Sequence, residues 1–207
     1  MSQLDLFAIP PRLTRDEALS LLAPYLGRNL RDISDQLGVT QPSVTPQNSG
    51  WVGHTVEWLL GQSPNNNQSP DFGTWELKSL TVRPHPDGHS WRPSGALVLT
   101  QFRPQDLAAT DFTESHLYAK IHALLLACHE APETSSHGAR LVKLSVYDLA
   151  DKVRDAVSHE YQELQWAVRS HGVMGLKDVS TRYLGAQSDG KLWRFVARQR
   201  WVEEMIR

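Results

Sequence analysis

The chain has 207 residues, of which 21 are basic and 23 acidic, and its formal net charge is −2. This length suits one large domain or two small lobes, and a hydrophobic content of 40% is enough for a core. The charge balance excludes a generally basic nucleic-acid-binding protein, so a DNA enzyme of this composition must concentrate positive charge in a cleft.

The cysteine and histidine content excludes two kinds of site. The single cysteine, Cys128, excludes an internal disulfide and a cysteine-based zinc site, and its apolar neighbours indicate a buried core residue. The nine histidines are scattered and form no His-x-x-x-His pair beside a suitable acid, so we interpret them as structural or surface residues. No signal peptide or membrane-spanning run is visible, which makes the cytoplasm the default expectation.

Residues 1–13 are predicted to form an N-terminal tail, because Pro10 and Pro11 interrupt regular structure. A hydrophobic segment within it resembles the short peptide by which bacterial DNA-processing proteins bind the replicative sliding clamp; it consists of Gln3, Leu4, Asp5, Leu6 and Phe7. In that interpretation the apolar side chains fill a pocket on the clamp. Alternatively, they pack on the protein's own core, and the sequence leaves both possibilities open.

Two short helices are predicted next. Thr14 and Glu17 form a capping box for the first, which Gly27 ends. The second covers residues 30–37. Its Asp32 and Asp35 would repel phosphates, so we favour a packing hairpin over a DNA-reading helix-turn-helix.

The central stretch, residues 50–80, reads as a helix, a polar loop and a strand, and it carries Glu57, Asp71, Glu76 and Lys78. Side chains alternate along a strand, so Glu76 and Lys78 share one face. Carboxylates beside a lysine can hold Mg²⁺ and assist phosphodiester hydrolysis. The pattern is also frequent by chance, and the alternative is an exposed strand with alternating charges.

The motifs around these residues resemble the MutH family of mismatch-repair nicking endonucleases and GATC-specific restriction enzymes, within the PD-(D/E)XK superfamily. The matching segments are Gly50-Trp51-Val52-Gly53, Glu57, Asp71-Phe72, Glu76-Leu77-Lys78, and Glu114-Ser115-His116 with Lys120. The resemblance covers roughly residues 14–172. It implies an α/β fold with a short mixed sheet flanked by helices and two lobes around a DNA cleft. The endonuclease domain would be residues 14–207, with a catalytic lobe at about 40–150.

The resemblance also implies roles for these residues. Asp71 and Glu76 would bind the metal, Mg²⁺ with Mn²⁺ as a substitute, and Lys78 would assist the attacking water. Glu57 would support the metal site, and Lys120 would lie near the scissile phosphate. On a helix predicted for residues 114–129, His116 lies roughly one turn from Lys120, so both could face the same cleft.

The remaining elements follow from apolar patterns. Residues 96–102 form a nearly continuous apolar run, which predicts a central strand, and residues 84–89 predict the turn of a long hairpin. Residues 140–146 predict another strand. Asp148 is expected to cap a long helix that runs to about residue 170.

Residues 173–207 carry basic side chains interleaved with aromatic ones, which suits contacts with the DNA backbone. The predicted DNA-binding residues are Ser49, His116, Arg182, Gln187, Lys191, Arg194 and Arg198. Alternatively, the aromatic residues pack inward from a terminal helix. Ser49 stands where the family has a lysine, and no Arg-Pro-Lys triplet follows Tyr183-Leu184. GATC specificity and a MutL-type partner therefore stay open.

Three functions are compatible with these observations. The first is Mg²⁺-dependent, sequence-specific nicking of DNA in mismatch repair, coupled to the sliding clamp. The second is a type II restriction endonuclease that makes double-strand breaks, and the third is a non-catalytic, clamp-associated DNA-binding adaptor. Nicking by a monomer, as opposed to double-strand cutting by a dimer, would separate the first two.

Overall fold

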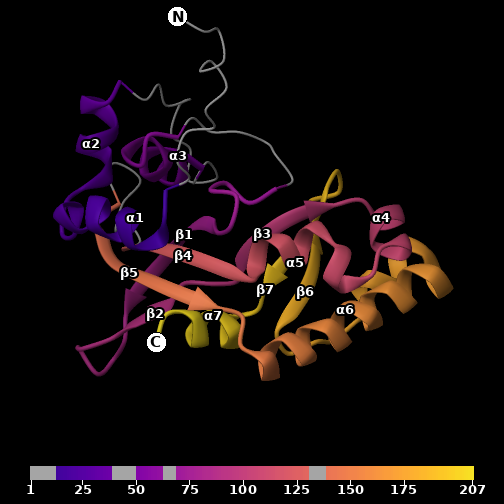
Figure 1. Cartoon of the computed structure of the whole chain (residues 1–207). Coiled ribbons are helices and arrows are strands. Elements are labelled where there is room, and N and C mark those ends of the chain that lie inside the picture. The colour runs from indigo at the N-terminus through magenta and orange to yellow at the C-terminus, as the bar shows by residue number, and fades with distance from the viewer. Residues whose placement is uncertain (1–12, 39–49, 63–68, 131–138) are drawn as a thin grey trace, which may run out of the picture.

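The computed structural model describes residues 13–38, 50–62, 69–130 and 139–207 (Figure 1). The tail peptide of residues 3–7 and Ser49 lie outside these ranges, so their predicted roles stay predictions. Within the described ranges, no helix combines the length and apolar character that crossing a bilayer requires.

A mixed four-stranded sheet forms the centre of the molecule. Its order is β2-β1-β4-β5, with bounds Trp91–Pro93, Glu76–Pro84, Ala123–Glu130 and Leu141–Asp148. β1 runs parallel to β4, and the other two pairs are antiparallel. Seven of the eight residues of β4 are buried, as expected for a strand covered on both faces. The expected α/β fold with a short mixed sheet is confirmed.

A second, antiparallel sheet joins the middle of the chain to its C-terminal part. Its order is β3-β7-β6, with bounds Leu97–Phe102, Trp193–Ala197 and Leu184–Ser188. One face packs into the larger hydrophobic core through Leu97, Leu99 and Phe195. The opposite face leaves Val98 and Gln101 exposed. This sheet therefore has one face in the core and an outer face that is exposed at Val98 and Gln101, although Val196 on that outer face is buried.

Three helices at one end of the molecule cover the mixed sheet (Figure 1). They are α1 Arg15–Leu22, α2 Leu30–Gln36 and α3 Gly50–Leu59, with a 3₁₀ turn, η1, at Ala23–Tyr25. The capping box of Thr14 and Glu17 is present at the start of α1. Leu22 and Val56 pack in one cluster with Leu77 of β1 and Leu125 of β4.

The other helices pack around the small sheet and the second core. They are α4 Pro104–Ala109, α5 His116–Ile121, α6 Asp151–His171 and α7 Gln199–Met205, with 3₁₀ turns η2 at Phe112–Glu114 and η3 at Gly172–Lys177. Val157, Tyr161 and Leu164 of α6 face this core, and so does Trp201 of α7. Trp201 is thus buried from a terminal helix, as the alternative interpretation of the C-terminal region expected, whereas Phe195 is buried from strand β7.

Four details of the predicted secondary structure were wrong. The helix expected over residues 114–129 ends at Ile121, and the apolar run after it is β4; such a run fits a buried strand as well as a helix, and pairing with β1 decides the outcome. The strand at 97–102 is an edge strand, β3. The hairpin of β1 and β2 has only three residue pairs. The N-cap of α6 is Ala150, not Asp148.

Candidate active site

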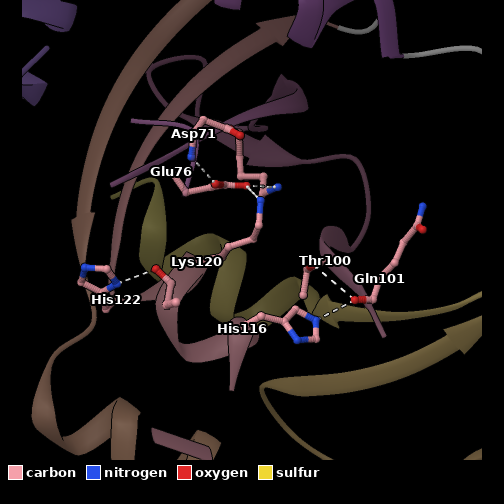
Figure 2. Close-up of polar contacts among 9 residues, drawn as sticks. Asp71, Glu76, Thr100, Gln101, His116, Lys120 and His122 are labelled. Atoms are coloured by element: carbon pink, nitrogen blue, oxygen red, sulfur yellow. Dashed lines mark hydrogen bonds and ion pairs between the residues drawn. The ribbon is translucent and has the colours of Figure 1, made fainter. Parts of the chain in front are cut away.

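Glu76 is the centre of a buried polar cluster. Its side chain is 1% exposed, and its Oε1 atom lies 2.7 Å from Nζ of Lys78 and 2.9 Å from Nζ of Lys120. Its Oε2 atom accepts a hydrogen bond of 3.0 Å from the backbone N–H of Asp71. Figure 2 shows Asp71, Glu76 and Lys120 converging from a turn, from β1 and from α5. The structure therefore brings together four of the five predicted catalytic residues. The fifth, Glu57, makes none of these contacts.

Local structure explains how these side chains are held. Phe72 and Trp75 stack with ring centroids 4.0 Å apart, and the Phe72 N–H donates to the Trp75 carbonyl, so the turn between Asp71 and Glu76 is closed. At the other side, Ser115 caps α5 by accepting from the N–H of Tyr118, while its own hydroxyl donates to the Phe112 carbonyl. Hydrogen bonds therefore hold the backbone on both sides of the cluster, in the turn before Glu76 and at the start of α5.

A cleft of about 370 Å³ opens beside the cluster, between α3, β1 and the segment of residues 95–98. Glu57 and Lys78 both line it, so Glu57 faces the cleft rather than open solvent. α3 approaches β1 closely at Gly53, where a Cβ atom would lie 3.4 Å from Oγ of Ser79. A methyl group at this position would therefore just touch the strand, so the helix and the strand are in close contact here.

Negative charge is crowded in this partly desolvated space. Burial, followed by repulsion from Asp71, raises the pKa of Glu57 to about 7, although Lys78 acts in the opposite direction. Burial and the charge of Glu76 raise the pKa of Asp71 as well, with Lys120 opposing. A positive ion placed among these carboxylates would relieve their mutual repulsion.

The donor set fits a hard divalent cation. The backbone N–H of Asp71 donates to Oε2 of Glu76, so these two acidic residues are neighbours at the site, and Mg²⁺ is typically held by one or two carboxylates together with water and substrate oxygens. Within the described ranges, no three histidine, cysteine or acidic side chains gather as a complete metal cage. The residues present therefore suit a cation whose remaining ligands come from water and DNA, and they do not suit a structural zinc site.

The predicted DNA-binding residues outside this cluster lie apart from it. His116 turns away from Glu76, and its Nε2 atom lies 2.7 Å from the carbonyl oxygen of Gln101 (Figure 2). Arg182 stacks over the ring of Tyr183, and Lys191 is exposed between β6 and β7. The last three, Gln187, Arg194 and Arg198, belong to or follow the small sheet.

A second cleft, of about 280 Å³, contains two of these residues. Gln187 and Arg198 line it together with Gly185 and Gln199. Ala96 lines both clefts, so the second cleft continues the first along the small sheet. Arg198 is fixed there by a 3.0 Å hydrogen bond from its Nε atom to Oγ1 of Thr181.

Sequence reasoning missed three residues near these clefts. His54 lines the first cleft and Gln199 the second. Gln101, the residue before the last in β3, is exposed on the outer face of the small sheet. His54 could have been found, because it precedes Glu57 by three positions on one helix and shares its side. Gln101 and Gln199 carry no local signal, since their placement depends on pairing between distant strands.

Comparison with known proteins identifies related sequences. Residues 28–106 match the MvaI/BcnI restriction endonuclease family. The DNA mismatch repair protein MutH of Vibrio cholerae is 31% identical over 75 residues, which make up 35% of this chain and 34% of that protein. MutH of Vibrio campbellii is 23% identical over 118 residues, 56% of this chain and 50% of that protein. The expected resemblance to MutH-type endonucleases is confirmed.

These matches cover only part of each protein. The chain spans about a third of the length of the MutH protein of Vibrio cholerae and half of that of Vibrio campbellii. The match to the MvaI/BcnI family ends at residue 106, so it includes Glu57, Asp71, Glu76 and Lys78 but not Lys120. The first cleft and β3 lie within the matched range, whereas β6, β7 and most of the second cleft lie beyond it.

Proposed function

From the match of residues 28–106 to a restriction endonuclease family, we propose that this chain is a Mg²⁺-dependent, sequence-specific DNA endonuclease of the restriction type. The observation that carries the proposal is the contact of Glu76 with Lys78, Lys120 and the backbone of Asp71, next to a cleft that Lys78 lines. Carboxylates and ammonium groups at one point are the components of metal-assisted phosphodiester hydrolysis.

Each residue has a role that its position supports. Asp71 and Glu76 would hold Mg²⁺, which when bound supplies Lewis-acid chemistry and activates water. Lys78 lines the cleft and is positioned to orient the attacking water by hydrogen bonding. Lys120 would contact the scissile phosphate, and Glu57 would support the metal site from α3. DNA would lie along the cleft, between the α1–α3 end of the molecule and the small sheet.

Two biological roles are compatible with this proposed activity. The MvaI/BcnI match favours a restriction enzyme that cuts both strands, whereas the matches to MutH favour nicking in mismatch repair. We favour the restriction role, because the family match covers the central catalytic residues from Glu57 to Lys78. A non-catalytic adaptor is disfavoured by the intact cluster around Glu76.

Plasmid cleavage tests the activity. We expect the wild-type protein with Mg²⁺ to convert supercoiled plasmid to linear product, and Asp71→Ala to bind DNA without cutting it. Asp155→Ala removes an exposed carboxylate of α6 and serves as the control that should cut normally. Equal cutting by wild type and Asp71→Ala would exclude the assigned site. Accumulation of nicked circles without linear product would instead favour the repair role.

A further inference from the structure

The exposed face of the small sheet carries a row of three polar side chains. Gln101 of β3 is paired with Arg194 of β7, and Arg194 is paired with Gln187 of β6. Residues directly opposite each other in antiparallel strands project from the same face. Gln101 and Gln187 are exposed, and the next residues toward the core, Phe102 and Phe195, are buried. The three side chains therefore form one line on the outer face.

This line belongs to the surface that holds the proposed catalytic cleft. The neighbouring row of the same face consists of Val98, Val196 and Gly185, two residues away along β6 and β7 and three along β3, whose register shifts between Val98 and Thr100. Val98 lines the cleft that contains Glu57 and Lys78, and Gly185 and Val196 line the second cleft. Both rows thus border the continuous surface on which DNA would lie.

The short helix α5 connects the row to the catalytic cluster. Its first residue, His116, donates from Nε2 to the carbonyl of Gln101, since a carbonyl can only accept. Its fifth residue, Lys120, reaches Oε1 of Glu76. Figure 2 shows these two contacts at opposite ends of the helix, with the Gln101 side chain pointing away from it. Helical residues four apart are separated by ~6 Å along the axis, so the row and the cluster keep a fixed spacing.

We propose that Gln101, Arg194 and Gln187 read base edges in the DNA groove next to the cleaved phosphate; this inference rests on the proposed function. Arginine pairs in bidentate fashion with guanine, and glutamine pairs with adenine. Neighbouring strands lie ~4.8 Å apart, so the row spans ~10 Å, about three base-pair steps of ~3.4 Å. The target then contains a G·C pair with A·T pairs within two steps on each side.

Arg194 is already oriented for such a contact. Its Nη2 atom lies 2.7 Å from Oδ2 of Asp189, and Oδ1 of Asp189 accepts hydrogen bonds from the N–H groups of Lys191 and Leu192. The carboxylate is therefore anchored in the turn between β6 and β7. Because the guanidinium is held before DNA arrives, little conformational entropy is lost when it binds a base.

Cleavage of a randomised duplex pool with Mg²⁺ tests the row. We expect wild type to select the target described, and Arg194→Lys, which keeps the charge but loses the planar fork, to lose discrimination at the G·C pair about ten-fold. Gln101→Ala and Gln187→Ala should each relax one flanking A·T position about ten-fold. Gln162→Ala on the exposed side of α6 is the matched control and should leave the target unchanged.

The outcomes separate this inference from the function on which it rests. If wild type cuts a defined target and the three variants keep its discrimination at every position, the row does not read bases. If wild type cuts no DNA, the endonuclease proposal fails. Base reading by the row is then tested by selecting the duplexes that wild type binds from the same pool. Selection of the G·C pair with flanking A·T pairs supports base reading, and binding without these preferences overturns it.

Discussion

Nζ of Lys120 lies 2.9 Å from Oε1 of Glu76, so two residues 44 positions apart share a buried ion pair. The pair joins the last turn of α5 to the first residue of β1. Because Lys78 contacts the same oxygen, the negative charge of Glu76 has two positive partners. The cluster therefore depends on tertiary packing between elements and not on the local strand motif alone.

Replacing Lys120 should affect both stability and cleavage. Lys120→Met keeps the aliphatic volume but leaves Glu76 with one positive partner, and we expect a loss of about 1–3 kcal/mol in unfolding free energy. Cleavage should fall at least ten-fold, because the proposed phosphate contact is lost. Urea denaturation and plasmid cleavage measure the two effects. Lys152→Met, on the exposed surface of α6, is the control, and a Lys120 variant as active as this control would contradict the role.

The parts of the structure that were predictable depend on local patterns. The capping box of Thr14 and Glu17 and the helix that carries Glu57 follow from neighbouring residues, and both are present. The shared face of Glu76 and Lys78 follows from strand alternation, and the two side chains meet at 2.7 Å. The contact of Asp71 with Glu76 required only a five-residue turn.

The parts that were not predictable depend on pairing between distant segments. The apolar run from Ala123 to Cys128 fits a helix or a strand by composition, and only its pairing with β1 makes it β4. The edge position of β3 results from pairing with β7, nearly a hundred residues later in the chain. For the same reason, no sequence pattern placed Gln101 beside Arg194.

Removing the charge of Glu57 should stabilise the metal-free protein. The pKa of Glu57 is raised to about 7, so at pH 8 its charged form is disfavoured in the fold. Glu57→Gln keeps the shape and removes the repulsion, and we expect an unchanged or higher unfolding free energy, by no more than about 2 kcal/mol after solvent screening. Mg²⁺-dependent cleavage should fall. Urea denaturation of both proteins at pH 8, with a chelator present to remove metal, measures the unfolding free energy. A Glu57→Gln variant clearly less stable than wild type would contradict the prediction.

Glu160 of α6 should be required for the position of β6. Its buried carboxylate accepts hydrogen bonds from the backbone N–H groups of Arg182, Tyr183 and Leu184 at 2.7–3.2 Å. Glu160→Ala leaves these donors without their acceptor, and we expect a loss of at least about 2 kcal/mol in thermal or urea unfolding. Glu163→Ala, on the exposed side of the same helix, should cost far less. Similar losses for both variants would show that Glu160 does not anchor the strand.

His129 should make the protein less stable in mild acid. Burial lowers its pKa from 6.5 to about 4, and its Nε2 atom lies 2.9 Å from Oγ1 of Thr81. Between these values the unfolded chain binds a proton that the folded protein does not, so stability falls as the pH drops from 6.5 toward 4, by roughly 3 kcal/mol at most.

His129→Gln can keep a hydrogen bond to Thr81 but cannot be protonated in this range, so its stability should decline less over the same pH interval. Urea denaturation of both proteins at several pH values between 7 and 4 gives the difference. His159→Gln replaces an exposed histidine and should follow the wild-type curve. Parallel curves for wild type and His129→Gln would mean that the buried imidazole does not control acid stability.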